Sequence, residues 1–406
     1  MTLTFRPALT TDLERLVAIH TSAYPDERRA DTRARNFTAN PNGALDDLWV
    51  AVDDGLVVGH SFLFALRAWF GGRALSVGAI ASVGVAPEAR GRGVASRLIA
   101  HLHDVAHARR LSLTILYPFR QGFYERLGYA AATPARHLRF AARALIAPSS
   151  TGLRLRAAEA RDRRSMALCW EAVGATGTGM LVRSPRQWNA RLSSEDRTWF
   201  VVEGSEGVEG YMAWKVVQPE PFLATTLVVR ELVARSDRAA RALWAAIAAQ
   251  RDQVTHVRAD VRDDDPIVYA LRDPDDGLHA DAEAPHPFGV LTLGPMVRVV
   301  DVARALRERG WREAGTLVLD VAGDLFSVTA EGGRAHVVRA ASRSRLRTRP
   351  KPDVRLSRAA LSAVAFGGVR PFHAARLGWL EARDTAALVR AERFLRLPPY
   401  FSPDRF

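Results

Sequence analysis

The chain of 406 residues has little of what builds covalent cross-links or membrane spans. It holds one cysteine, Cys169, which excludes an internal disulfide and a metal site made of several cysteines. No apolar run approaches the roughly 18 residues needed to span a bilayer. The first residues lack the pattern of a signal peptide. We therefore expect a cytoplasmic globular protein with no metal site and no membrane partner.

Lysine is also nearly absent, since it occurs only at 215 and 351 and the other basic residues are arginine. The formal net charge of +13 favours attraction of polyanions, including the phosphates of a nucleotide cofactor. A genome rich in G and C produces the same excess of arginine and is the simpler interpretation. The arginines are scattered, and no basic arm is interleaved with aromatics, so we expect no nucleic-acid partner. A DNA-associated protein ranks last and predicts strongly salt-dependent binding.

The length exceeds one ordinary core and predicts two or three domains. The first segment has the pattern of a strand, a helix, a polar loop over 25–46, three further strands, a helix and a last strand. A second segment from about 150 repeats this order and predicts an internal structural repeat. The third segment mixes helices and strands. Its tail from 398 onward carries three prolines that forbid a helix, and its large aromatics predict that it docks on the protein.

One glycine-rich loop is suited to hold a pyrophosphate. A strand ends at Val85, and the run Arg90-Gly91-Arg92-Gly93-Val94-Ala95 then opens an amphipathic helix. Free amides and the dipole at a helix N-terminus favour negative charge. Small residues at 91, 93 and 95 let the ligand approach the backbone, and the two arginines add charge-assisted hydrogen bonds. A lone glycine-rich loop is weak evidence, but this place between a strand and a helix predicts a nucleotide cofactor site.

The segment from Ser82 to Ala95 resembles motif A of the GNAT acetyltransferase superfamily, whose pattern is Arg/Gln-x-x-Gly-x-Gly/Ala. The resemblance implies that acetyl-CoA is the co-substrate and that the strand before the loop pairs with its pantetheine arm. It also implies that the amide of Val83 polarises the thioester carbonyl. The residues implied to bind acetyl-CoA are Val83, Gly84, Val85, Arg90, Gly91, Arg92, Gly93, Val94, Ala95, Ser96, Phe119 and Arg120.

The run from Gly122 to Tyr129 resembles motif B of the same superfamily. A tyrosine in this motif donates a proton to the departing CoA thiolate. Tyr124 and Tyr129 compete for this role, and either is also explained as a core aromatic. We expect Tyr124 to be the proton donor, because the family's acid tyrosine precedes the Gly-Tyr pair by four to five residues.

The length, the degenerate second segment and the terminal phenylalanine resemble the Eis branch of the superfamily. That resemblance implies an α+β protein made of two tandem GNAT-like α/β domains and a sterol-carrier-protein-like α+β domain. The expected ranges are 1–147 for the GNAT domain, 148–290 for the GNAT-like domain and 291–406 for the last domain. The second segment lacks the motif A loop, so we expect acetyl-CoA only in the first. The resemblance also implies a homohexamer.

In the Eis branch the C-terminal carboxylate enters the active site as the general base, which here assigns the role of proton acceptor to Phe406. A carboxylate buried beside apolar groups has a raised pKa, and a raised pKa makes it a better base near neutral pH. The residues alone favour a disordered chain end. The resemblance reverses that expectation.

The resemblance implies that an amine is acetylated by direct attack within a ternary complex, with an aminoglycoside, a polyamine or a lysine side chain as acceptor. Asp26 and Glu27 are candidates to bind a cationic acceptor, although solvated loop charge explains them equally well. Phe37 either lines the pocket or fills a core. Arg405 replaces the acidic residue that some relatives carry there, which disfavours highly cationic acceptors. The alternative hypothesis is a binding protein whose sterol-carrier-like domain holds a lipid or small molecule.

Overall fold

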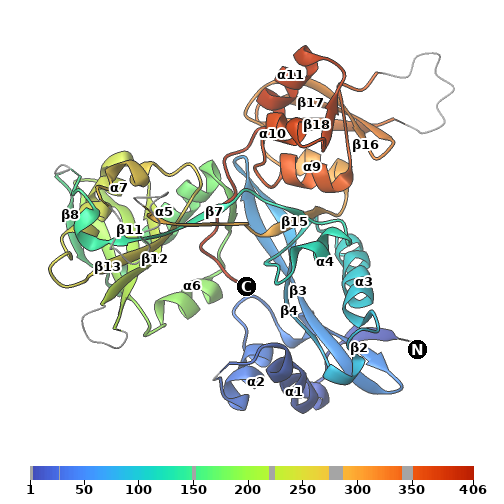
Figure 1. The fold of residues 1–406 in the computed structure, drawn as a ribbon, viewed down its shortest axis with the longest axis horizontal. Helices are drawn as coiled ribbons and strands as arrows, with labels where there is room; N and C mark the ends of the chain where they lie inside the picture. Colours follow the sequence, from blue (N-terminus) through green and yellow to red (C-terminus); the bar gives the residue numbers. More distant parts are fainter. Residues whose placement is uncertain (1–2, 27, 149–151, 219–224, 274–286, 341–350) are drawn as a thin grey trace.

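The computed structural model describes residues 3–26, 28–148, 152–218, 225–273, 287–340 and 351–406. Within these residues the strands form three β-sheets, which lie in three lobes joined by crossing strands (Figure 1). Short 3-10 helices are η1 (Thr10–Asp12), η2 (Leu45–Asp47), η3 (Pro87–Ala89), η4 (Ala142–Ala144), η5 (Ala160–Asp162) and η6 (Pro266–Ala270).

The first sheet has the order β1-β2-β3-β4-β5-β15-β6, and β9 pairs with β3. Its strands are β1 (Thr4–Pro7), β2 (Leu48–Asp53), β3 (Leu56–Phe70), β4 (Arg73–Val85), β5 (Leu113–Leu116), β6 (Ala130–Ala131), β9 (Thr178–Leu181) and β15 (Met296–Val299). Its helices are α1 (Leu13–Ala23), α2 (Ala30–Thr38), α3 (Val94–Ala108) and α4 (Gln121–Glu125). Gly71 and Gly72, both at positive φ, close the long β3–β4 hairpin.

The second sheet has the order β14-β7-β13-β12-β11-β10-β8. Its strands are β7 (Ala135–Ala141), β8 (Arg154–Ala157), β10 (Thr198–Gly204), β11 (Gly207–Val217), β12 (Thr226–Ala234), β13 (His256–Val261) and β14 (Gly289–Thr292). The helices of this domain are α5 (Arg163–Thr176), α6 (Pro185–Leu192) and α7 (Asp237–Ala248). The neighbour order from β8 to β13 repeats the order from β1 to β5, which confirms the predicted internal repeat.

The two repeats exchange a strand. β7 follows the first repeat along the chain but pairs antiparallel with β13 of the second sheet. β15 follows the second repeat but pairs antiparallel with β5 of the first sheet. The expected boundaries at 147/148 and 290/291 therefore do not coincide with the limits of the sheets, because β7 lies before the first boundary and β15 lies after the second.

The third sheet has the order β18-β17-β16-β19-β20. Its strands are β16 (Gly315–Val321), β17 (Asp324–Glu331), β18 (Arg334–Arg339), β19 (Val354–Leu356) and β20 (Leu380–Ala382). The helices are α8 (Val302–Glu308), α9 (Arg358–Ala365), α10 (Pro371–Arg376) and α11 (Thr385–Leu395). Val77 and Leu113 of the first sheet belong to the same apolar core as Leu317 and Leu319 of the third, so these two domains pack as one body.

One predicted element was wrong. The segment 25–46 was expected to be a loop, but it contains α2 (Ala30–Thr38). Within this helix only Arg33 and Phe37 are buried, and the exposed positions are polar or small. Two buried residues one turn apart, one of them charged, do not produce the apolar stripe by which a helix is recognised in a sequence.

The tail beyond Leu397 has no helix or strand and docks against the first two domains, as predicted. It leaves the third domain and runs down between the other two (Figure 1). The Tyr400 amide donates to Thr133 Oγ1 at 2.6 Å, and the Phe401 amide donates to the Thr178 carbonyl at 2.9 Å. The Tyr400 ring is buried. The chain end is thus returned to the first domain.

Candidate active site

The parallel strands β4 and β5 diverge and leave part of β4 open. They pair only over Val77–Ala79 and Leu113–Ile115. β4 then continues to Val85 with no strand partner on that side in the described part of the chain. Its exposed backbone edge offers amides and carbonyls to an extended ligand, as an unpaired strand edge does. This opening is the natural place for an arm that bears amide groups.

A β-bulge shapes the end of β4. The β3–β4 register shifts between His60 and Phe62, and Ser82 takes a φ of 51°, in the left-handed region. Val83 has no register partner on β3, and its carbonyl accepts a hydrogen bond from the Tyr24 hydroxyl at 3.1 Å. The bulge takes Val83 out of the regular ladder and turns it toward Tyr24.

The loop after β4 is open to a ligand. Gly91 and Gly93 have φ values of 74° and 76°, and a Cβ built on either would have no atom within 4 Å. Gly93 is the N-cap of α3, and no side chain caps the helix there. The first amides of α3 therefore keep their hydrogen-bonding capacity for an anion. The structure fits the phosphate-binding role predicted for this loop.

The two arginines of the loop contact the protein. The Arg90 guanidinium donates to the Val85 carbonyl at 3.2 Å and to Ser22 Oγ at 2.9 Å. Arg92 Nη2 forms an ion pair with Asp53 at 3.1 Å, and its side chain is 48% exposed. In this arrangement Arg90 fixes the loop between β4 and α1. Val94 is buried, whereas Ala95 and Ser96 are half-buried.

Tyr124 lies in α4 within a cluster of aromatic rings. Its ring centre lies 4.9 Å from that of Phe123 and 6.1 Å from that of Phe119, and the side chain is buried. Burial, together with the neighbouring hydroxyls of Tyr24 and Tyr129, raises the pKa of Tyr124, so that it keeps its proton at neutral pH. Val83 packs against the apolar cluster that contains Tyr124, so Tyr124 lies on the side of the β4 bulge.

The competing Tyr129 has a different environment. Its hydroxyl lies 3.0 Å from Nε2 of His103, and its side chain is buried. A buried hydroxyl with an internal hydrogen-bond partner is typical of a tyrosine in the protein core. Phe119 and Arg120, also expected at the cofactor site, are exposed where β5 leads into α4, and Arg120 is the N-cap of α4.

The last residues of the chain surround Tyr117, which directly follows β5. The Tyr117 hydroxyl donates to the Asp404 carbonyl at 2.8 Å. The Phe406 ring centre lies 5.2 Å from that of Tyr117, and the Arg405 guanidinium carbon lies 4.3 Å from the same ring centre. Burial raises the pKa of Tyr117 to about 12, so it remains a donor. The terminal residue therefore lies at the end of β5, the strand that diverges from β4.

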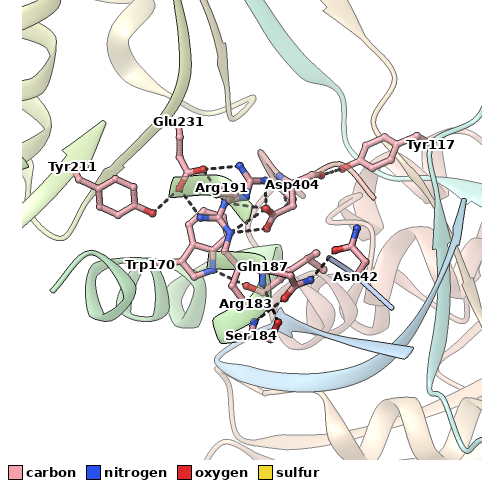
Figure 2. Close-up of polar contacts among 12 residues, drawn as sticks. Asn42, Tyr117, Trp170, Arg183, Ser184, Gln187, Arg191, Tyr211, Glu231 and Asp404 are labelled. Atoms are coloured by element: carbon pink, nitrogen blue, oxygen red, sulfur yellow. Dashed lines mark hydrogen bonds and ion pairs between the residues drawn. The ribbon is translucent and has the colours of Figure 1, made fainter. Parts of the chain in front are cut away.

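A buried ion network fastens this tail to the second domain (Figure 2). Arg183 donates to Glu231 at 2.7 and 2.8 Å and to Asp404 at 2.9 and 3.1 Å. Arg191 bonds the same two carboxylates, and the Tyr211 hydroxyl donates to Glu231 at 2.6 Å. All four charged side chains are at least four-fifths buried.

Two tryptophan rings pack against the Arg183 side of this network. The Arg183 guanidinium carbon lies 3.3 Å from the Trp170 ring centre and 4.8 Å from that of Trp188, so the cation is held between two aromatic faces. Gln187, on α6 beside it, donates to Asn42 of the first domain at 2.8 Å. The second domain thus holds the tail and also contacts the first domain directly.

The residues predicted to bind the acceptor are placed as follows. Asp26 forms ion pairs with Arg28 and Arg33, at 2.7 Å and 2.6 Å. The hydrogen bond from Arg28, aided by Arg33, holds the pKa of Asp26 at about 2. Phe37 is buried against the rings of the first-domain core. Glu27 lies outside the described residues. The Asp26 carboxylate is already matched by two cations.

His60, which no sequence pattern singles out, lies under the bulge. It is fully buried, and a Cβ built on Gly84 would come within 2.6 Å of its Nε2. Its ring stacks on that of His20, with centres 5.9 Å apart. Burial lowers the pKa of His60 to about 3, so it is neutral. A lone histidine in an apolar strand carries no sequence signal that separates this position from an ordinary core site.

Comparison with protein families gives the identity of the three parts. Acetyltransferase (GNAT) domain models match residues 4–132 and residues 179–299, and a sterol carrier protein domain matches residues 302–402. The chain belongs to the GNAT acetyltransferases. The predicted fold class, two tandem GNAT domains followed by a sterol-carrier-like domain, is confirmed. An N-acetyltransferase is confirmed as the class of enzyme.

This GNAT acetyltransferase has relatives described as uncharacterized N-acetyltransferases. It is 29% identical over 297 residues to one from Streptomyces avermitilis, covering 67% of each chain. It is 28% identical over 298 residues to one from Streptomyces griseus, covering 66% of this chain and 68% of the other.

Solved structures share the fold of the whole acetyltransferase. A GCN5-related N-acetyltransferase from Anabaena variabilis matches with a TM-score of 0.84 at 20% identity. Eis1 from Mycobacterium abscessus matches with a TM-score of 0.77 at 21% identity. In both comparisons 100% of each chain is covered. The architecture is thus Eis-like.

The described residues offer neither a membrane span nor a cluster of metal ligands. No helix among them has both the length and the apolar character needed to cross a membrane. The same residues contain no group of three or more histidine, cysteine, aspartate or glutamate side chains placed to hold a metal ion.

Proposed function

We propose that this protein is an acetyl-CoA-dependent N-acetyltransferase of the Eis type, which transfers an acetyl group to an amine by direct attack in a ternary complex. The observation that carries the proposal is the convergence of three features at the β4–β5 opening. These are the open loop from Arg90 to Ala95, the buried Tyr124, and the chain end on Tyr117.

Acetyl-CoA would bind along the opening. Its pyrophosphate would be held by the first amides of α3, where Gly91 and Gly93 leave open space. Its pantetheine amides would pair with the free edge of β4 near Val83–Val85. The Val83 amide would then donate to the thioester oxygen as negative charge develops there. Binding in this place orients the thioester carbon toward the acceptor amine.

The proton transfers are assigned to two groups. The carboxylate of Phe406 takes a proton from the acceptor ammonium, and the neutral amine attacks the thioester carbon. The new N–C bond forms as the C–S bond breaks. The Tyr124 hydroxyl, whose raised pKa keeps it protonated, donates to the departing thiolate. The new amide nitrogen gives its extra proton to water, so the products are the neutral acetamide and the free CoA thiol. Phe406 then releases one proton to water and Tyr124 takes one up, which returns both groups to their starting states.

Resemblance to the Eis branch extends the proposal to a homohexamer in the cytoplasm, with no nucleic-acid partner. Light scattering of the purified protein measures the assembly. A monomer at micromolar concentration would contradict that part alone.

The activity is tested by thiol release from acetyl-CoA with a panel of aminoglycosides, polyamines and lysine peptides. We expect CoA release that depends on an amine, with the acetamide found by mass spectrometry. Tyr129→Phe is a matched control for Tyr124→Phe, because it also removes one buried hydroxyl from the same aromatic cluster. Equal losses of turnover in the two variants would contradict the assignment of Tyr124. No amine-dependent release from any amine would contradict the proposed activity.

A further inference from the structure

A cavity of about 1190 Å³ lies where the second domain meets the tail. Its walls come from strands β7, β12, β13 and β14, from helix α6, from Asn42 of the first domain, and from Pro403–Arg405 of the tail. Figure 2 shows Asn42, Arg191 and Asp404 around this junction. The cavity thus borders the residue that directly precedes Phe406.

Positive charge predominates on its walls. The lining arginines are Arg139, Arg191, Arg197, Arg230, Arg258 and Arg405. The lining acids are Asp196, Asp260 and Asp404. Each acid already has a partner, since Asp196 pairs with Arg197, Asp260 with His137 at 2.6 Å, and Asp404 with Arg191. Two of the acids are therefore paired with arginines, and the third is hydrogen-bonded to a histidine.

Three of the arginines are left without a carboxylate. Within the described part of the chain, Arg230, Arg258 and Arg405 form no ion pair with an aspartate or glutamate, and all three are exposed. Unbalanced guanidinium groups on the wall of a cavity attract a negatively charged group and can bind a carboxylate or phosphate through two parallel hydrogen bonds.

The pairing register of the second sheet places Arg230 and Arg258 on the same face. Arg258 on β13 lies directly opposite Arg139 on β7, another arginine that lines the cavity. Val228 on β12 is level with Arg258, so Arg230, two residues further on, follows on the same face. The opposite face of these strands holds core residues such as Phe140 and Val257. The sheet thus places Arg230 and Arg258 on the face that borders the cavity.

We propose that the acceptor amine carries an anionic group, a carboxylate or a phosphate, which Arg230, Arg258 and Arg405 bind. This inference rests on the proposed acetyltransferase function, because it names the substrate class of the same site. Arg405 connects the two regions, since it lines the cavity while its guanidinium lies on Tyr117, the residue that Phe406 contacts. Asp26, the acid predicted to attract a polycation, is matched by Arg28 and Arg33.

The test uses pairs of amines that differ only in the anionic group. The phosphate arm compares glucosamine 6-phosphate with glucosamine, and the carboxylate arm compares the peptides Gly-Glu-amide and Gly-Gln-amide. We expect kcat/KM from thiol release to be at least about 10-fold higher for the anionic member of one arm, mainly through KM. The arm that responds distinguishes a phosphate from a carboxylate.

The double variant Arg230→Gln, Arg258→Gln should bring this ratio to about one, without lowering Tm. Arg164→Gln is the matched control, because Arg164 is exposed on α5 of the same domain and does not line the cavity. We expect it to keep the wild-type ratio. A double variant that keeps the full preference would overturn the role of these two arginines.

The outcomes separate the two proposals. If neutral amines are acetylated as well as their anionic counterparts in both arms, the proposed function holds and the anionic acceptor is refuted. If no amine releases CoA, the proposed function fails, and the cavity is tested by calorimetric titration of glucosamine 6-phosphate and Gly-Glu-amide. Equal affinity of the wild type and the double variant for both compounds would then refute the anion site.

Discussion

Replacing Asp404 by asparagine tests how the chain end is held. Asp404 is buried and accepts hydrogen bonds from both Arg183 and Arg191. Asparagine keeps the volume but removes the charge, which leaves two guanidinium groups with Glu231 as their shared carboxylate. Removing one partner of a buried ion pair costs about 3–5 kcal/mol. The asparagine oxygen still accepts one hydrogen bond, so we expect a cost of about 3 kcal/mol, near the lower end of that range.

This cost falls on the docking of the tail. Tyr400 and Phe401 are held upstream by their own backbone hydrogen bonds, so Asp404→Asn should release only the residues after them. A cost of about 3 kcal/mol shifts the equilibrium between docked and free tail by roughly 100-fold.

The assay is the rate at which carboxypeptidase removes Phe406. Digestion through a rapidly opening state follows the population of that state, so the rate should rise by roughly 100-fold in Asp404→Asn. Ser402→Ala is the control, because Ser402 Oγ accepts only one weak hydrogen bond, from the Asp404 amide at 3.3 Å. It should change the rate by a few-fold at most. Release of Phe406 from Asp404→Asn at the wild-type rate would refute the role of the ion network.

Three further predictions concern the first domain. Tyr124→Phe should lower kcat by about 100-fold and leave the Kd of acetyl-CoA unchanged, as measured by steady-state kinetics and calorimetry. Gly93→Ala forces a side chain into the left-handed region at a cost of about 1–2 kcal/mol, so differential scanning calorimetry should show a lower Tm. Burial lowers the pKa of His60 from 6.5 in the unfolded chain to about 3 in the folded protein. The stability that the protein has above pH 6.5 is therefore partly lost as the pH falls below that value, because the unfolded chain then binds a proton that folded His60 does not. The lowered pKa values of His20 and His103 remain in His60→Gln, so urea titrations between pH 7 and pH 5 should show a loss about 2 kcal/mol smaller in that variant than in the wild type. An equal loss in the two proteins would exclude His60 as a contributor.

The features that could be predicted from the sequence are those whose signal is local. The motif A loop has its spacing, glycines and flanking elements within one short stretch, and the structure places the left-handed turns at Gly91 and Gly93. The repeat could be recognised because each copy has its own strand and helix periodicity. The prolines and aromatics of the tail predicted a docked segment without secondary structure, which is what the structure shows.

Features that depend on distant parts of the chain could not be predicted. Arg183 and Asp404 are 221 residues apart, and neither has a neighbour in sequence that marks it as one half of an ion pair. The exchange of β7 and β15 leaves each strand with an ordinary apolar pattern, because a strand completes either sheet equally well. Asp26 was a reasonable acceptor ligand by charge, but the buried Arg33 that pairs with it lies on a helix that the sequence did not reveal.

The rate of thiol release by the variant that lacks Phe406 tests the central claim most directly. We expect thiol release to fall by at least about 100-fold with the Kd of acetyl-CoA unchanged, because the carboxylate moves back to Arg405 and the general base is lost. Phe406→Leu keeps the terminal carboxylate and an apolar side chain, and should retain most of the rate. Turnover of the shortened chain at the wild-type rate would contradict the assignment of the terminal carboxylate as the base.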